Sequence, residues 1–284
     1  MRLTLRAATA AALVMAPGFY AHAQNAGKNL AMDFRTTISI QGTPDSTVML
    51  GHSVGTADKM RLDVKSSGSR VTPLQSDSVV TMILTDSGKT ITYIDATNRQ
   101  YLRVRPADMV AQAQQVGGVK MDFSATEAKV DNLGAGPTIL GHPTAHYRVA
   151  TGMTMTVTAM GQQQTVQIAS TTDSYYATDI KGVLNPFASL SGGDMANMFG
   201  TGNNEFAAKL KAAQAKLPKG TPLRASSSAK IISQDQTRVT NSSAEVTALR
   251  WVDADPKLFE VPSNYTAVQR PGAAGSSGGA IPPK

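Results

Sequence analysis

The 284-residue chain contains no cysteine, and this absence excludes several kinds of chemistry. It can have no disulfide, no thiolate metal site, no cysteine nucleophile and no thioether lipid anchor. Charged residues are also scarce, at 17%, while hydrophobic residues make up 41%. That balance is too apolar and too weakly charged for a wholly disordered chain. No stretch after the first 23 residues is long and apolar enough to predict a membrane helix.

The two ends of the chain have compositions unlike its middle. Residues 1–23 combine a basic start, an apolar run over 7–16 and Ala21-His22-Ala23 before Gln24. This pattern is typical of a cleavable signal peptide, although a buried N-terminal helix is the alternative. We therefore expect a periplasmic protein that is not a lipoprotein. Residues 270–284 are mostly Pro, Gly, Ala and Ser and predict a disordered tail, which leaves a single domain over 29–269.

Long alternating segments between the two ends predict β-strands. Leu30, Met32 and Phe34 share one parity, whereas Asp33 and Arg35 share the other, as expected of a strand with one buried face. Similar segments lie at 47–50, 60–65, 79–84, 90–94, 146–158, 165–169, 226–233 and 245–252. Turns are predicted at 86–88 and 161–163, because both stretches contain glycine with polar neighbours.

Helices are predicted at few places. The segment 106–116 begins with proline and ends at two glycines, and 205–217 lies between Asn204 and Pro218. A short turn of helix is expected at 194–199. A one-faced antiparallel sheet must cover its apolar side, so we predict a mainly β (α+β) fold: a large curved antiparallel sheet covered by two or three short helices.

Two motifs suggest catalysis or metal binding, but their context favours simpler interpretations. The segment 51–55 matches the G-x-S-x-G elbow of serine hydrolases, with Ser53 as nucleophile. The residues after it alternate like a strand instead of forming the required helix, so we expect a plain turn at the surface. His142 and His146 have the spacing of two ligands on a helix, but Pro143 and the following alternation favour a turn and strand.

Other patterns are also weak signals of chemistry. Ser227 and Lys230 match S-x-x-K, but on a strand their side chains point to opposite faces. Met153, Met155 and Met160 could form a methionine copper site, but the first two lie on the apolar parity, which favours core packing. We therefore predict no catalytic residue, no metal site and no cofactor.

The chain is basic, with 27 Lys and Arg against 20 Asp and Glu. Local positive groups surround Tyr101 and recur over 209–219. The members of these groups are Arg99, Arg103, Arg105, Lys209, Lys211, Lys216 and Lys219. A periplasmic address argues against nucleic acid as a partner. Anionic lipid headgroups are an alternative partner, and a solvated surface that keeps the protein soluble is the default interpretation.

Several short motifs, taken in order, resemble a known bacterial family. They are the strand 59–63, the hairpin around 92–95 with Tyr101, the segment 139–149, the segment 176–180, Gly220 to Arg224, and Phe259 to Tyr265. Together they resemble the uncharacterised family called domain of unknown function 4412 over residues 58–266. The sequence departs from that pattern in its Met/Thr/Gln hairpin at 151–170, in the Met-rich stretch 185–204, and in Tyr176 where the family has Trp.

The resemblance implies a fold like the lipoprotein carriers of the Gram-negative envelope (LolA/LolB-like): a curved, incompletely closed antiparallel sheet with helices over its concave face. In such carriers the concave face takes acyl chains. Our leading hypothesis is therefore a non-enzymatic periplasmic binder of a hydrophobic or lipid-like ligand. The alternatives are an envelope protein–protein adaptor and a serine hydrolase using Ser53. The expected ligand-lining residues are Met153, Met155, Val157, Met195, Met198, Phe199, Phe206 and Leu210.

Overall fold

The computed structural model describes residues 28–44, 46–67, 79–105, 108, 120–159, 162–184, 204–233 and 236–268. These residues form twelve strands, one α-helix, α5 (Asn204–Gln214), and two short 3-10 helices, η1 (Asp86–Gly88) and η2 (Pro256–Phe259). The strands are β1 (Asn29–Ile40), β2 (Ser46–Gly55), β3 (Met60–Ser66), β4 (Val79–Thr85), β5 (Thr90–Asp95), β6 (Gln100–Val104), β7 (Lys120–Ala135), β8 (Thr144–Ala159), β9 (Gln162–Ala177), β10 (Thr221–Ser233), β11 (Gln236–Val252) and β12 (Thr266–Ala267).

All twelve strands belong to one sheet, in the order β12-β6-β5-β4-β3-β2-β1-β11-β10-β9-β8-β7. Neighbouring strands run antiparallel, except that β12 pairs parallel with β6. The order consists of two runs of sequential neighbours, β1 to β6 and β7 to β11. The two runs are joined where the first strand pairs with the eleventh, Asn29 lying opposite Val252.

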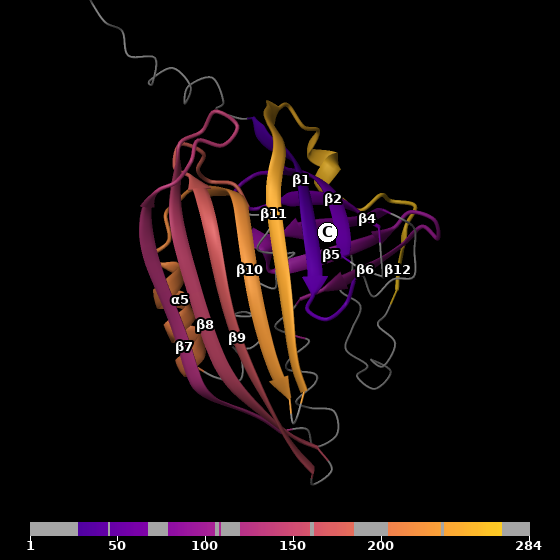
Figure 1. The fold of residues 1–284 in the computed structure, drawn as a ribbon. Helices are drawn as coiled ribbons and strands as arrows, with labels where there is room; N and C mark the ends of the chain where they lie inside the picture. The colour runs from indigo at the N-terminus through magenta and orange to yellow at the C-terminus, as the bar shows by residue number, and fades with distance from the viewer. Residues whose placement is uncertain are drawn as a thin grey trace, which may run out of the picture.

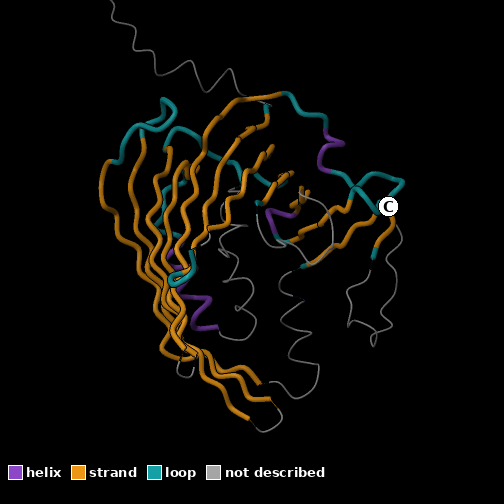
Figure 2. The backbone as a smooth tube through the Cα atoms, turned by 45° about the vertical axis from the view of Figure 1, so that its right-hand side comes forward, coloured by secondary structure: helices purple, strands orange, loops and turns teal. Residues whose placement is uncertain are grey.

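The sheet is strongly curved and open. Figure 1 shows the long strands β7 to β11 as one wall, with β4, β5 and β6 lying behind β1 and β2. Figure 2 shows the same sheet as an arch, with α5 on its concave side. The predicted mainly β fold with a curved, incompletely closed antiparallel sheet is therefore confirmed.

The core lies on the concave face of β1 to β5. Alternation places Leu30, Met32 and Phe34 of β1 on this face, where they are almost fully buried, as the sequence pattern predicts. Met60, Leu62, Val64, Met82 and Leu84 extend this core across β3 and β4. Methionine contributes much of the core volume, which suits an irregular curved surface because its side chain is unbranched and flexible.

The chain after β11 covers part of the opposite, convex face. Ala31, Val54 and Ile83 are buried although they alternate away from the main core. The helix η2 contacts β3 and β4, and Leu258 within it is half-buried. The segment ends as β12 on the edge of β6. Residues 253–268 therefore act as a C-terminal strap across this end of the sheet.

Several elements differ from the sequence expectations. The helix expected at 205–217 is present as α5, and among the described residues no helix has the length and apolarity to cross a membrane. The turn expected at 161–163 is wrong in part, because Gln162 and Gln163 already belong to β9. The signal peptide, the tail 270–284, the helix at 194–199 and nearly all of the helix at 106–116 lie outside the described residues.

Candidate ligand-binding face

The two faces of the sheet differ in their chemistry. Aliphatic, methionine and small hydroxyl side chains lie on the concave face, whereas the ion pairs between described strand residues lie on the convex face. This division follows from alternation, since each strand sends successive side chains to opposite sides. It makes the concave face the candidate for an apolar ligand and the convex face a charged outer surface.

The predicted ligand-lining residues fall into three groups. Met153 and Leu210 are buried together, and Phe123, Ala128 and Ile168 pack against them. This small cluster joins α5 to β7, β8 and β9. It confirms that Met153 lies on the covered side of β8 and that Leu210 faces the sheet.

Met155 and Val157 follow Met153 on the same side of β8 but are only half-buried. The threonines between them, Thr154 and Thr156, are half-buried as well. Exposure therefore does not separate the two faces beyond Met153. Both faces of this end of the hairpin are partly open.

The remaining predicted lining residues are not placed by the structure. Met195, Met198 and Phe199 lie outside the described residues. Phe206 belongs to α5, but its side chain is not among those described. Met160, considered for a copper site, also lies outside the described part of the chain.

Beyond the main core, the concave face continues over β9, β10 and β11 as a surface of small side chains. On β10, Ala225, Ser227 and Ala229 are half-buried, while Ser226 and Ser228 between them are exposed. The same alternation brings Ile168, Ser170 and Thr172 of β9, and Thr240, Ser242 and Ala244 of β11, to this side. Thr172 Oγ1 donates a hydrogen bond of 3.0 Å to Ser227 Oγ. We refer to the eight small residues of this set, without Ile168, as the small-residue floor.

The glycine-bounded serine motif lies inside β2, so the expected surface turn is wrong. Ser53 is fully buried between Met32 and Leu62 of the neighbouring strands, and Gly51 gives room for the Phe34 ring. A Cβ at Gly51 would lie 2.0 Å from Phe34 Cζ. The glycines thus serve packing in a strand. His52 lies on the opposite face from Ser53, so these neighbours cannot form a serine–histidine pair.

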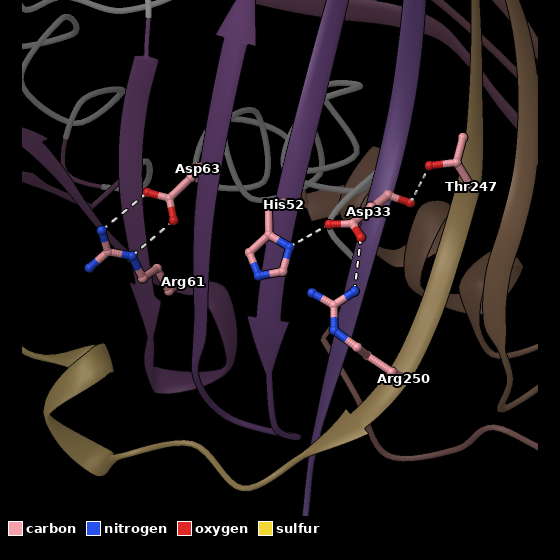
Figure 3. A network of polar contacts seen from close by, with 6 residues as sticks. All are labelled: Asp33, His52, Arg61, Asp63, Thr247 and Arg250. Carbon is pink, nitrogen blue, oxygen red and sulfur yellow. Dashed lines mark hydrogen bonds and ion pairs between the residues drawn. The ribbon is translucent and has the colours of Figure 1, made fainter.

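His52 instead belongs to a charged network on the convex face (Figure 3). Its Nδ1 lies 2.5 Å from Asp33 Oδ1, and Arg250 Nη1 donates to Asp33 Oδ2 at 2.9 Å. The hydrogen bond with His52 lowers the pKa of Asp33 most strongly. Partial burial opposes that effect, and Arg250 lowers the pKa further.

Polar side chains of β3 and β4 lie beside this network on the same convex face. Arg61 donates two hydrogen bonds to Asp63, from Nε at 3.0 Å and from Nη2 at 3.2 Å, as Figure 3 shows. Thr81 Oγ1 donates to the same carboxylate. Thr247, the extra residue at a bulge in β11, donates its hydroxyl to the Asp33 carbonyl oxygen. These bonds form two groups on the convex face, one that links β11, β1 and β2 and one that links β3 and β4.

The histidines considered as metal ligands bind different carboxylates. His142 Nδ1 lies 2.8 Å from Asp179 Oδ2, whereas His146 Nε2 lies 2.9 Å from Asp173 Oδ1 and its ring stacks on Tyr175. Burial raises the pKa of Asp173, but hydrogen bonds from Arg148 and then His146 outweigh it, and the pKa is lowered overall. These pairs connect β8, β9 and the turns beside them, and they do not converge on a shared ligand position.

Sequence reasoning missed these charged networks. The alternation of polar residues on β1 and β2 indicated a wet face, but Arg250 lies more than 200 residues from Asp33 in the sequence. Only the pairing of β1 with β11 brings the two residues together. The S-x-x-K motif was interpreted correctly, since Ser227 lies on the small-residue floor and Lys230 is exposed on the other side.

Comparisons with known proteins show no family. No protein-family model matches the chain, and no curated protein matches it in sequence. The resemblance to domain of unknown function 4412 therefore stays a prediction.

The solved structures that are similar to the chain include the following two. One is PNGF-II, with 12% identity and a TM-score of 0.31, covering 85% of this chain. The chain spans 31% of that protein's length. The other is described as an outer membrane lipoprotein-sorting protein domain from Vibrio parahaemolyticus, with 8% identity and a TM-score of 0.28, covering 82% of this chain and 89% of that one. At these TM-scores neither likeness supports an argument about fold or function.

Proposed function

We propose that the protein is a non-enzymatic periplasmic binder that holds a hydrophobic or lipid-like ligand on the concave face of its sheet. One observation carries the proposal. The concave face continues from a buried methionine core onto the small-residue floor, which is half-buried, while the ion pairs between described strand residues lie on the other face. Small side chains leave room for a ligand, and methionine adapts to varied apolar shapes.

The same asymmetry argues against the enzyme hypothesis. Ser53 is buried and turned away from His52, so the residue that suggested a hydrolase lacks both access and a base beside it. The predicted export signal supports the periplasmic location. An adaptor that binds a protein through its charged convex face remains the second candidate, supported by the networks around Asp33 and Asp173.

A pair of neighbouring substitutions tests the binding face. Ala229→Asp places a charge on the small-residue floor, whereas Ser228→Asp places the same charge on the exposed side of the same strand. We expect Ala229→Asp to abolish binding of a fluorescent long-chain ester, because its carboxylate would lie against the acyl chain. Ser228→Asp should bind like the wild type. Circular dichroism would confirm that both variants fold.

Native mass spectrometry of the protein purified from periplasm provides a complementary test. A co-purifying acyl lipid that is lost in Ala229→Asp and kept in Ser228→Asp would support the proposal. A wild-type protein that carries no lipid and binds no long-chain ester would contradict it and favour the adaptor.

A further inference from the structure

Two hydroxyl groups are buried on the concave face without hydrogen-bond partners among the described residues: Ser53 Oγ and Thr36 Oγ1. Ser53 is 0% exposed and Thr36 is 6% exposed. A buried hydroxyl that makes no hydrogen bond destabilises the fold, because its hydrogen bonds to water are lost and not replaced. Two such groups in one apolar core therefore call for an explanation.

The backbone around these hydroxyls offers no partner. Ser53 lies in β2, which is paired in continuous register with β1 on one side and β3 on the other. Thr36 lies in β1, between β2 and β11. The backbone N–H and C=O groups of these central strands pair in the sheet ladder, and neither hydroxyl makes a hydrogen bond to them.

The side chains beside the two hydroxyls are apolar. Ser53 has Met32 and Leu62 as its cross-strand neighbours, and Thr36 has Met49 and Ala244. The Phe34 ring lies over Gly51, between the two hydroxyls along the strands. Ser53 and Thr36 are thus separate polar points within a continuous aliphatic and methionine surface.

We infer that these hydroxyls donate to the ester carbonyl groups of an acylated lipid, and that the ligand of the concave face is therefore a neutral acyl ester and not a free fatty-acid anion. This inference rests on the proposed function and names its ligand class. A carboxylate beside Ser53 or Thr36 would be buried with no cation among their cross-strand neighbours, which is costly. An ester carbonyl accepts a hydroxyl hydrogen bond without carrying a charge, and the attached chain suits the surrounding methionines.

Because Ser53 and Thr36 are buried, an ester can reach their hydroxyls only if neighbouring side chains move. Met32 and Met49 are the immediate neighbours that can move, since methionine has three rotatable bonds and no branch. Binding sites often keep groups that lower the stability of the ligand-free protein, because those groups are needed for function. The two unsatisfied hydroxyls fit this pattern.

The test compares stability and binding in isosteric variants of the full exported chain. Ser53→Ala and Thr36→Val remove the hydroxyls with little change of shape. We expect each to raise the thermal midpoint of the lipid-free protein by about 2–4 °C, because an unsatisfied group is removed. Each should also weaken binding of the methyl ester of cis-parinaric acid, followed by its fluorescence, by about two- to tenfold. Thr36→Ser should keep the wild-type affinity.

Thr247→Val is the matched control, because Thr247 Oγ1 already donates to the Asp33 carbonyl oxygen and lies outside the small-residue floor. It should not raise the thermal midpoint, and it should change the ester affinity by less than about twofold. The wild type should bind the methyl ester more tightly than the free acid at neutral pH.

The outcomes separate the inference from the proposed function. A wild type that binds neither probe overturns both. A wild type that binds the ester, with Ser53→Ala and Thr36→Val unchanged in affinity, overturns the inference alone. A lower thermal midpoint in these two variants would show that the hydroxyls are satisfied internally, for example by buried water, and would also overturn it.

Discussion

At the scale of single residues, the contact between Phe34 and Gly51 explains why a motif that resembles a catalytic elbow is structural. The ring of Phe34 occupies the space where a side chain at position 51 would lie. A glycine in a strand normally weakens it, so its presence here marks close packing. Gly51, which the G-x-S-x-G motif suggested as part of a catalytic turn, instead makes room for the Phe34 ring.

Gly51→Ala should therefore destabilise the protein. The new Cβ would meet three Phe34 ring atoms at 2.0, 2.4 and 2.5 Å, and overpacking of this kind costs about 1–3 kcal/mol. Urea denaturation would measure the change. Gly152→Ala is the control, because the nearest atom to a Cβ there is 3.9 Å away. Equal stability of the two variants would show that the Phe34 ring is not fixed over β2.

The Asp33 carboxylate provides a second prediction at this scale. Its pKa is lower in the folded protein than its ordinary value of 3.8, mainly because of the hydrogen bond with His52. The stabilisation is therefore fully present above pH 3.8 and is lost as the pH falls through the lower folded-state pKa. Asp33→Asn should be less stable than the wild type at pH 6, and the difference should shrink in acid.

The size of this effect is limited by exposure, since the Asp33 side chain is 38% exposed. After screening by solvent we expect less than about 1 kcal/mol. Urea unfolding at several pH values would measure it. Arg250→Gln keeps the His52 bond and should retain most of the pH dependence. If the difference in unfolding free energy between the wild type and Asp33→Asn stayed constant from pH 6 to pH 3, the lowered pKa of Asp33 would be contradicted.

At the scale of elements, α5 is attached to the sheet through a small apolar contact. Leu210 and Met153 are its buried members, and Lys209 Nζ donates to the Thr126 carbonyl oxygen of β7 at 3.0 Å. The bond reaches β7 where its pairing with β8 is irregular, between Ser124 and Glu127. The helix thus covers an apolar part of the concave face and also occupies a carbonyl group of the edge strand.

Leu210→Ala should loosen α5 from the sheet. Removing a buried leucine side chain costs about 2–5 kcal/mol, and the low end is expected here because the cluster is small. Met153→Ala should cost a similar amount, and the double variant should show a coupling of at least about 0.5 kcal/mol because the two residues are in contact. Lys211→Ala, on the exposed side of α5, is the control. Additive effects would mean that the helix does not depend on this contact.

The elements also show how far the sequence predicted the structure. Strict alternation identified β1, β3 and the burial of Leu30, Met32 and Phe34, because a continuous strand keeps its parity. It missed β7, since the pairing irregularity between Ser124 and Glu127 shifts the apolar residues from Phe123 to Ala128 and breaks the period of two. A local pattern cannot identify a strand whose parity changes within it.

For the candidate site, the sequence predicted the covered side of β8 through Met153 and the sheet-facing side of α5 through Leu210. It could not predict the polar row of Asp33 and Arg250, because strand pairing over such a distance leaves no local trace. It also could not show that Ser53 is buried. Ser53 is buried because β2 is a central strand of the sheet. A short segment such as 47–50 does not show where its strand will lie in the sheet.

At the scale of the whole molecule, the C-terminal strap connects the middle of the sheet to one of its edges. It leaves β11 in the middle of the strand order, crosses to η2, and ends on the edge of β6. Truncation after Val252 should therefore expose the convex apolar residues Ala31, Val54 and Ile83 and lower the thermal midpoint by many degrees. Truncation after Val268 should leave the midpoint nearly unchanged, because the residues beyond it are too poor in apolar groups to form a core.

Differential scanning calorimetry of the two truncated proteins would test this difference. A large loss of stability on removing residues 269–284 would mean that the tail packs against the domain. No loss on removing the strap would mean that other parts of the chain bury the convex residues.

The pairing of β1 with β11 has a consequence for how the chain reaches its native state. The first strand occupies the centre of the sheet, yet its partner is the last long strand to leave a ribosome or a translocation channel. Contacts so distant in sequence make folding slow, because loop closure must precede them. Until β11 arrives, β1 presents an unpaired apolar edge that can aggregate with other chains. We expect refolding from urea in the range of milliseconds to seconds or slower, with yields that fall as protein concentration rises.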